Sequence, residues 1–276
     1  MPVPTPTTTI KSCESASINT LNASVFEVIL HIKQIPAISY QAGQYLDLII
    51  NNEPFPFSIA CSYQNSLMSQ EQHIQLHIGV PDEDSAAFRI IQHLHKQQPF
   101  SLELPKGQCH IDDSSQAPLL IIAAGTGFSQ AKALIEHSLQ TNENRAIHLY
   151  WGVRDPTQFY QLDLLKQWAK AHSTLSIELA ASDSTTPSFI NELPLRKGNV
   201  HQLVMQDWQS LEHAHVYLCG SPAMVYNASD ELTTKGLNMD TTQSDVFDYF
   251  PRAAYEQSLI ADATGNSDKK EGKKGE

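Results

Sequence analysis

The chain has 276 residues, of which 41% are hydrophobic, and its formal charge at pH 7 is −12. This length accommodates one or two domains with a buried core, and the negative charge argues against nucleic acid and anionic membranes as partners. No apolar run approaches the ~20 residues that a membrane-spanning helix needs, and the first residues lack the basic and apolar regions of a signal peptide, so we expect a cytoplasmic location and no membrane partner.

Metal-binding signals in the sequence are weak. The chain contains four cysteines: Cys13, Cys61, Cys109 and Cys219. They are too far apart for a cysteine-rich zinc site or a clustered iron–sulfur motif, and free thiols are typical of a reducing compartment. The twelve histidines include His-x-His pairs at 93–95 and 213–215, and neither has a clear third ligand. The sequence therefore predicts no metal site and no iron–sulfur cluster.

The first part of the chain has the pattern of short strands separated by turns. Residues 1–9 are rich in proline and threonine, and we expect them to be disordered. Between residues 10 and 112 the β-rich or alternating runs are 25–32, 44–50 and 74–79. A single helix is predicted over 85–95. Short strands joined by turns predict an antiparallel β-barrel over residues 10–112.

The pattern changes after the polar segment at 112–117. Buried strands are predicted at 119–124, 146–152, 175–181 and 215–220. Helices are predicted at 129–140, 159–171 and 222–235, with a weaker one at 200–209. Alternating strands and helices predict a parallel sheet covered on both faces, an α/β domain over residues 113–252. Residues 253–276 lose this periodicity, and we expect a disordered tail.

A glycine loop joins the first strand of the second domain to its helix. Gly125, Thr126 and Gly127 follow the apolar run 119–124. Glycines let the backbone approach a ligand, and the start of a helix offers free N–H groups to a phosphate. A purely structural turn has the same pattern, so the loop alone leaves both interpretations open. Two further groups, at 152–155 and 219–222, follow later strands and are placed at the same sheet edge.

Four motifs occur in a set order along the chain. They are Phe55-Pro56-Phe57-Ser58-Ile59-Ala60, Ala124-Gly125-Thr126-Gly127-Phe128-Ser129, Tyr150-Trp151-Gly152-Val153-Arg154 and Cys219-Gly220-Ser221-Pro222-Ala223-Met224. Over residues 10–250 this set resembles the ferredoxin–NADP reductase superfamily, and within it the small bacterial NAD(P)H:flavin oxidoreductases. The resemblance implies a flavin-binding barrel followed by an NAD(P)H-binding α/β domain. It also implies hydride transfer from NADH or NADPH to a loosely bound flavin, which is riboflavin, FMN or FAD.

The resemblance also implies roles for individual residues. On the flavin side, it implies that Phe57 lines the ring and that Ser58 is a catalytic hydrogen-bond partner of flavin N5. Ile59 and Phe250, the latter from a C-terminal aromatic segment, would complete this side. Without the motif, an inward-facing core residue of a strand is the favoured interpretation of Phe57.

On the nucleotide side, the resemblance implies that the glycine loop holds the pyrophosphate, with Phe128 directly after it. Cys219, with Gly220, would shape the pocket near nicotinamide C4 as a catalytic residue. Arg154 would contact the ribose or a phosphate. A buried hydrophobe at Cys219 and an Arg154–Asp155 ion pair are the alternatives.

Phe55 departs from the pattern of these reductases, which have arginine at that position. Phenylalanine cannot bind a phosphate. Either the flavin is held loosely through its ring, or its phosphate is bound at Ser85, at the start of the predicted helix. The acidic run 82–84 disfavours an anion at Ser85. The alternatives to a flavin reductase are a flavoprotein that passes electrons to a partner protein and a non-catalytic regulatory protein that retains the fold. A flavin-dependent acceptor enzyme is an expected partner.

Overall fold

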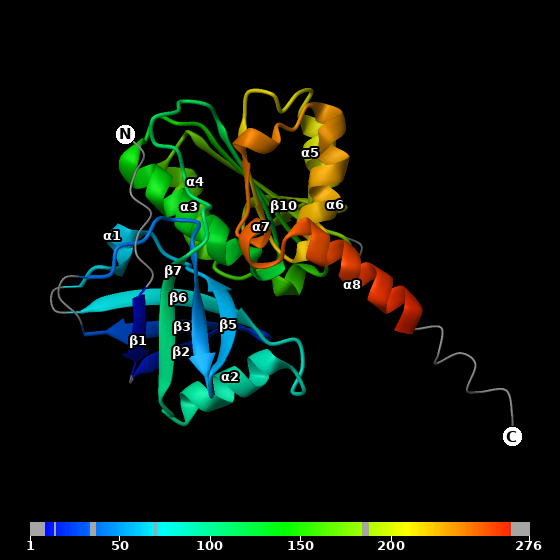
Figure 1. Ribbon diagram of the computed structural model, residues 1–276. Coiled ribbons are helices and arrows are strands. Elements are labelled where there is room, and N and C mark those ends of the chain that lie inside the picture. Colours follow the sequence, from blue (N-terminus) through cyan, green and yellow to red (C-terminus); the bar gives the residue numbers. More distant parts are fainter. Residues whose placement is uncertain (1–8, 14, 34–36, 69–70, 184–187, 266–276) are drawn as a thin grey trace, which may run out of the picture.

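The computed structural model describes residues 9–13, 15–33, 37–68, 71–183 and 188–265. In Figure 1 a β-barrel lies below an α/β domain, and the chain passes once from the lower to the upper part between β7 and β8. The segments 1–8 and 266–276, where we expect disorder, lie outside the described residues. Thr9, which was also expected to be disordered, is the first residue of strand β1, which pairs with β7.

The N-terminal half is the antiparallel barrel that the sequence predicts. One sheet has the strand order β1-β7-β4-β5, the other has the order β2-β3-β6, and every pairing is antiparallel. Alternate side chains such as Leu30, Leu48 and Leu76 are fully buried between the sheets. The strands are β1 (Thr9–Cys13), β2 (Ala16–Asn22), β3 (Val25–Ile32), β4 (Tyr45–Ile50), β5 (Glu53–Ser58), β6 (Gln72–Gly79) and β7 (Phe100–Lys106), with helices α1 (Tyr63–Ser66) and α2 (Ala86–His95).

The C-terminal half is the expected α/β domain. Its sheet has the order β11-β12-β10-β9-β8-β13-β14, and all of its pairings except β11–β12 are parallel. The strands are β8 (Leu119–Ala124), β9 (Ile147–Val153), β10 (Leu175–Ala181), β11 (Phe189–Ile190), β12 (Leu193–Lys197), β13 (His215–Cys219) and β14 (Thr242–Gln243). The helices are α3 (Phe128–Thr141), α4 (Leu162–Ala171), α5 (Val200–Asp207), α6 (Pro222–Leu232), α7 (Val246–Tyr249) and α8 (Arg252–Gly265).

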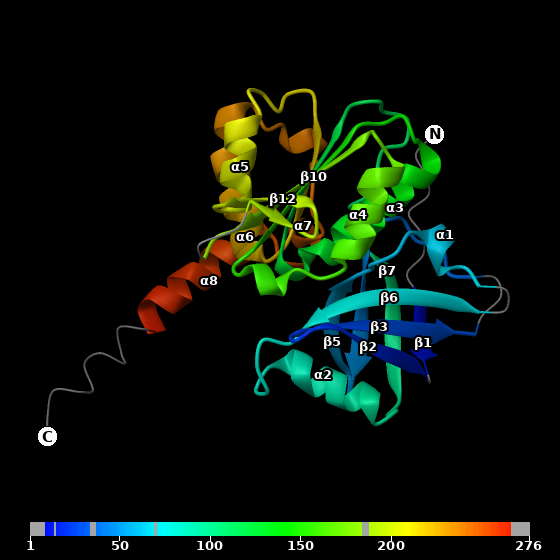
Figure 2. The ribbon, with the colours of Figure 1, turned by 180° about the vertical axis from the view of Figure 1, so that it is seen from behind.

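Helices cover both faces of this sheet, as Figure 2 shows from behind. On β8, Leu119 and Ile121 pack into one buried cluster with residues of α3 and α4, whereas Leu120 and Ile122 pack into a second cluster with residues of α5 and α6. A strand that is buried on both faces needs a continuous apolar sequence. The prediction of a parallel sheet covered on both sides is therefore confirmed.

The expectation of a structureless tail from Ala253 is wrong for residues 253–265, which belong to α8. The first part of this helix is anchored, because Arg252 binds the Asp230 carboxylate at 2.6 Å and Tyr255 stacks on Tyr226 at 4.9 Å. Farther along, Leu259 and Ile260 are 49% and 64% exposed. Over residues 252–261, where burial is described, the helix buries no continuous apolar stripe. Its sequence accordingly lacks the periodicity that would have predicted it.

Helix α3 fixes the two domains against each other. Lys132 of α3 donates to the Ala60 carbonyl of the barrel at 2.8 Å, and Gln130 donates to the Gly43 carbonyl at 2.8 Å. Glu136 accepts from the Ser62 N–H at 2.9 Å and pairs with Lys132 at 2.6 Å. These groups are buried, and paired buried charges are costly to separate. The interface therefore holds the end of β5 and the start of α3 in a fixed relation.

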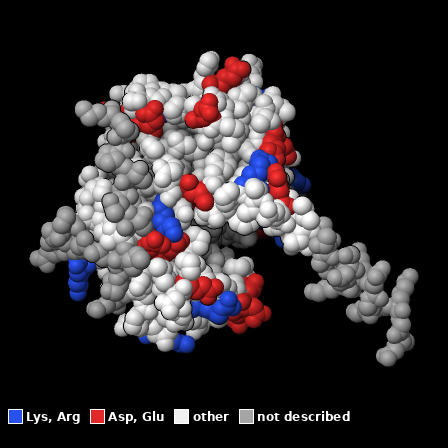
Figure 3. Space-filling view, viewed as in Figure 1, with Lys and Arg blue, Asp and Glu red and all other residues white. Residues whose placement is uncertain are grey.

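The surface carries charges of both signs over both domains, as the face in Figure 3 shows. Among the described residues, no helix has both the length and the apolar character to cross a membrane.

Candidate active site

The glycine loop lies at the point where the strand order of the α/β sheet reverses. Strand β8 has β9 on one side and β13 on the other, so the loops after β8 and β13 meet there. Open α/β sheets bind ligands at this crevice. The two loops are in close contact: a Cβ atom on Gly127 would lie 2.0 Å from the carbonyl oxygen of Cys219. Gly127 is therefore required by packing.

Gly125 has a different reason to be glycine. Its φ is +54°, in the left-handed region, and an added Cβ would meet no atom within 4 Å. Its carbonyl accepts a 2.9 Å hydrogen bond from the Trp151 indole, which stacks on Phe128 with ring centroids 4.2 Å apart. The Trp151 side chain thus supports the loop on one side, and the space next to Gly125 on the other side is open. This is the arrangement that lets a backbone approach a phosphate at the first turn of α3.

In front of the loop lies a cleft of about 760 Å³ between the two domains. Gly125, Thr126 and Arg154 line it from the α/β domain, and Val25 and Val80 line it from the barrel. Three of the residues expected to bind the nucleotide therefore share one cavity. Gly127, Phe128, Ser58, Cys219 and the other predicted residues do not line it. Phe128 is fully buried, so its contribution is to support the loop.

One hydrogen bond joins the glycine loop to the barrel motif. Ser129, two residues after Gly127, donates its hydroxyl to the Ser58 carbonyl at 3.0 Å. Ser58 ends β5, and Ser129 belongs to the first turn of α3. The strand expected to carry the flavin and the helix expected to meet the nucleotide phosphates are therefore adjacent, although 71 residues separate Ser58 from Ser129.

The Ser58 side chain has an acidic partner. Its hydroxyl donates a 2.5 Å hydrogen bond to Oδ2 of Asp245, which is 3% exposed. Burial raises the pKa of Asp245 to about 6, although the bond from Ser58 opposes this shift. Asp245 therefore changes its charge near neutral pH, next to the residue expected to be catalytic.

Asp245 belongs to a C-terminal segment, residues 242–250, that docks on the barrel. Asp248 accepts from the Gln108 N–H at 2.8 Å, and the Tyr249 ring meets the Tyr45 ring edge-on at 5.7 Å. The carbonyl of Phe250 accepts from the Tyr226 hydroxyl at 2.8 Å, and its side chain is half-buried. The segment thus places Asp245 against Ser58, whereas Phe250 packs with the buried cluster beneath α5 and α6.

Comparison with known proteins agrees with this arrangement. A family model described as the oxidoreductase NAD-binding domain matches residues 121–230. The NAD(P)H-flavin reductase of Aliivibrio fischeri is 30% identical over 229 residues, which cover 81% of this chain and 92% of that protein. The NAD(P)H-flavin reductase of Vibrio harveyi is 29% identical over 230 residues, covering 80% and 91%.

The chain belongs to the NAD(P)H-flavin reductase family. The resemblance to the ferredoxin–NADP reductase superfamily is confirmed. Among solved structures, the Amycolatopsis cytochrome P450 reductase GcoB has a TM-score of 0.74 at 19% identity, covering 87% of this chain and 70% of that one. The ferredoxin reductase in carbazole 1,9a-dioxygenase has a TM-score of 0.73 at 19% identity, covering 88% and 70%. At this identity the structures support the fold.

In this NAD(P)H-flavin reductase family member, Cys219 is 1% exposed. Burial raises the pKa of its thiol well above the usual value, and Cys109 and Asp245 raise it further. A neutral buried thiol is a poor nucleophile. This argues against a nucleophilic role for Cys219. A Cβ added at the neighbouring Gly220 would lie 3.1 Å from the Met224 sulfur, so a side chain there would be crowded.

Arg154 lines the cleft, and 79% of its side chain is exposed. Its Nε pairs with Asp183 at 2.7 Å. Asp155, the alternative partner considered from the sequence, instead accepts from the Thr157 N–H at 2.9 Å. The guanidinium is therefore held at the cleft.

Ser85 directly precedes α2, and its hydroxyl both donates and accepts a hydrogen bond within the surrounding backbone. It donates to the Asp82 carbonyl at 2.7 Å and accepts from the Phe88 N–H at 3.1 Å. Phe55 and Phe57, on the same side of β5, are partly buried against the barrel core, and Ile59 is fully buried. The barrel thus offers an apolar surface, and the Ser85 hydroxyl is already satisfied by its own helix.

Sequence reasoning missed Asp245, Ser129 and the supporting role of Trp151. Ser129 and Trp151 stood inside the quoted motifs, so their places were known but their partners were not. Asp245 stood outside every motif, and only the fold brings it to Ser58.

Proposed function

We propose that this protein is an NAD(P)H-dependent flavin reductase, in which a hydride passes from the nicotinamide to a loosely bound flavin. The proposal rests on the Ser129–Ser58 hydrogen bond, which keeps the glycine loop adjacent to the expected flavin strand. Family membership supports the same chemistry. When bound, the two cofactors supply the redox chemistry, and the protein supplies their proximity and orientation.

The nucleotide half of the proposal is supported by the fit of the loop. Gly125 presents backbone with no side chain toward open space, next to the start of α3. Gly125 and Thr126 would hold the pyrophosphate, Gly127 would keep the loop close to Cys219, and Arg154 would meet the ribose or a phosphate from the cleft mouth. Cys219 and Gly220 would bound the nicotinamide pocket.

The flavin half of the proposal assigns the ring to Phe57 and Ser58. Ser58 would orient the ring at N5, and Phe250 would cover it. The pairing with Asp245 determines which way the Ser58 hydroxyl points. An ionised Asp245 accepts the hydroxyl hydrogen, whereas an Asp245 protonated at Oδ2 donates to Ser58 Oγ and leaves that hydrogen for another acceptor.

Weak phosphate recognition supports a flavin that exchanges. Phe55 supplies no charge, the Ser85 hydroxyl is satisfied by its own turn, and Asp82, Glu83 and Asp84 are exposed beside it. A flavin would therefore be bound mainly through its ring, and riboflavin and FMN would serve nearly equally well. Reduced flavin would then leave for a flavin-dependent acceptor enzyme.

The test is to record the visible spectrum of the purified protein and to assay NADH and NADPH oxidation with riboflavin, FMN or FAD. We expect a colourless protein that turns over with added flavin. A yellow colour that survives dialysis would instead indicate a flavoprotein that passes electrons to a partner protein. Absence of both turnover and flavin binding would leave the non-catalytic alternative.

A further inference from the structure

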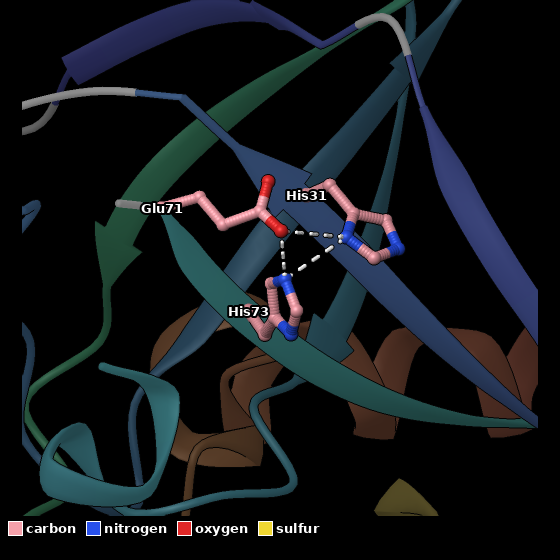
Figure 4. A group of neighbouring side chains, drawn as sticks. All are labelled: His31, Glu71 and His73. Carbon is pink, nitrogen blue, oxygen red and sulfur yellow. Dashed lines mark hydrogen bonds and ion pairs between the residues drawn. The ribbon is translucent and has the colours of Figure 1, made fainter. Parts of the chain in front are cut away.

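Three side chains with metal-ligating atoms converge on the barrel, away from the cleft. Figure 4 shows His31 from β3 with Glu71, which directly precedes β6, and His73 from the start of β6. His31 Nδ1 lies 3.0 Å from His73 Nε2, and Glu71 Oε1 lies 2.5 Å from His73 Nε2 and 3.7 Å from His31 Nδ1. Ligands bound tetrahedrally at ~2.0–2.1 Å are separated by about 3.3 Å. The three separations bracket this value.

The backbone around these side chains is well fixed. His31 and His73 are direct partners in the antiparallel β3–β6 ladder. Between Glu71 and His73, the fully buried Gln72 side chain accepts from the Ile38 N–H at 3.0 Å and donates to the Ile38 carbonyl at 2.9 Å. The side chains of Glu71 and His73 are therefore held beside His31 by the strand pairing and by Gln72.

His31 also has the outer hydrogen bond that orients metal-bound histidines. Its Nε2 lies 2.7 Å from the Ser17 hydroxyl of β2. When Nε2–H donates to that hydroxyl, the Nδ1 lone pair faces Glu71 and His73. Such outer partners fix the tautomer and raise the ligand's basicity. Ser17, from a neighbouring strand, thus orients His31 toward the other two groups.

The cluster is accessible and lies far from the proposed nucleotide site. The three side chains are 21% (His31), 29% (Glu71) and 22% (His73) exposed. At the other end of the same ladder Val25 pairs with Gly79, and both line the cleft. Six residues of strand separate the two ends, or about 20 Å at ~3.3 Å per residue. The cluster is therefore separate from the proposed catalytic machinery.

We propose that His31, Glu71 and His73 bind a divalent transition metal ion of the zinc class. Two imidazoles and one carboxylate suit Zn²⁺ better than Mg²⁺ or Ca²⁺, and a three-ligand site leaves a position for water. Metal binding at His73 displaces to solvent the proton on Nε2, which in the metal-free chain faces Glu71 Oε1 at 2.5 Å and His31 Nδ1 at 3.0 Å. The sequence does not predict this site, because a metal-binding pattern such as His-x-His is local. His31 and Glu71 are 40 residues apart along the chain and meet only in the folded barrel.

The test uses the full chain without a histidine tag, first treated with chelator and then titrated with Zn²⁺ by calorimetry. We expect one equivalent to bind in a saturable phase, and the variant carrying both His31→Ala and His73→Ala to lose it. Glu71→Gln keeps the shape of the side chain and should weaken binding by about tenfold or more. The matched control is the His93→Ala/His95→Ala variant, which removes two histidines that are neighbours only in sequence and should bind as the wild type does.

Two further readouts do not depend on enzyme activity. Co²⁺ should give a visible d–d spectrum in the wild type and in the control, and not in the His31→Ala/His73→Ala variant. At a Zn²⁺ concentration ~100 times Kd, Tm should rise by about 5 °C in the wild type. Absence of a one-to-one phase in the wild type, or its persistence in the His31→Ala/His73→Ala variant, would overturn the proposal.

Discussion

The hydroxyl of Ser58 donates a 2.5 Å hydrogen bond to Oδ2 of Asp245, a carboxyl group whose burial raises its pKa to about 6. The pair joins the end of barrel strand β5 to the segment before α7, across 187 residues of sequence. The hydrogen bond therefore links Ser58, which we propose orients the flavin, to the Asp245 carboxyl group, which gains or loses a proton near neutral pH.

At pH 5, where a protonated Asp245 leaves the Ser58 hydrogen for the flavin, replacing Ser58 by alanine should lower the rate of hydride transfer by about 10²-fold, which is typical of losing one preorganised hydrogen-bond donor. Flavin affinity should change by less than about threefold, because the apolar surface around Phe57 remains. Stopped-flow single turnovers and flavin titrations measure the two quantities. Ser101→Ala, on barrel strand β7, is the control. An unchanged rate in Ser58→Ala would remove Ser58 from its assigned role.

Asp245→Asn should abolish a pH step in the hydride-transfer rate. In the wild type the rate should fall as pH rises through about 6. An ionised Asp245 accepts the hydrogen of the Ser58 hydroxyl, which is then no longer donated to flavin N5. Asparagine donates to Ser58 Oγ at every pH, so the variant should keep the rate that the wild type has at low pH. Single turnovers between pH 5 and 8 measure this. Asp248→Asn, in the same segment, should keep the step but move it to lower pH, because the charge of Asp248 helps to raise the pKa of Asp245. A step that survives in Asp245→Asn would contradict the assignment.

Asp245 and His77 should impose opposite pH dependences on stability. Burial lowers the pKa of His77 to about 3, so between pH 6.5 and 3 the unfolded chain binds a proton that the folded chain does not, and acid destabilises the fold. Asp245 has a raised pKa of about 6, so between pH 3.8 and 6 the folded chain binds the extra proton, and acid stabilises the fold. Each slope is at most ~1.4 kcal/mol per pH unit.

The two single variants separate these effects. From pH 6 to pH 4, Asp245→Asn should lose stability on acidification, whereas His77→Phe should gain it. At pH 7.5, Asp245→Asn should be more stable than the wild type by about 2–3 kcal/mol, because it removes a buried charge. Urea unfolding at pH 4, 5, 6 and 7.5 measures both slopes. Parallel curves for the two variants would show that neither group is shifted as proposed.

The sequence predicts those parts of the fold that have a periodic pattern. Strands β3, β8 and β10 begin and end at the predicted residues, because alternating or continuous apolar runs report burial directly. Helix α8 was missed because only its first part is anchored, through Arg252 and Tyr255.

Contacts between residues that are far apart in the chain leave no periodic pattern in the sequence. The Gly125-Thr126-Gly127 loop was found from sequence, but the separate reasons for its two glycines were not. Gly127 faces the Cys219 carbonyl and Gly125 faces open space, and only the tertiary structure distinguishes them. Asp245 was missed for the same reason.

Alanine at these two glycines should therefore have different effects. Gly127→Ala places a Cβ 2.0 Å from the Cys219 carbonyl oxygen and should destabilise the protein by about 3 kcal/mol. Gly125→Ala meets no atom and should cost only about 1 kcal/mol, for its left-handed backbone. Its Cβ points into the proposed phosphate site and should raise KM for the nicotinamide nucleotide several-fold. Thermal unfolding and steady-state kinetics measure the two effects; the reverse pattern would contradict the loop's proposed role.

Phe55→Arg should shift flavin preference from riboflavin toward FMN. Phe55 and Phe57 lie on the same side of β5, about 7 Å apart along the strand, so a guanidinium at position 55 would reach beyond the proposed ring site toward a ribityl phosphate. One charge-assisted contact to phosphate is worth ~1.5 kcal/mol, or about tenfold in affinity. KM for FMN should fall by about tenfold, and KM for riboflavin should stay within about twofold. Phe55→Leu is the control, because it removes the ring without adding charge. The same FMN-to-riboflavin ratio in both variants would contradict the idea that the missing cation explains loose flavin binding.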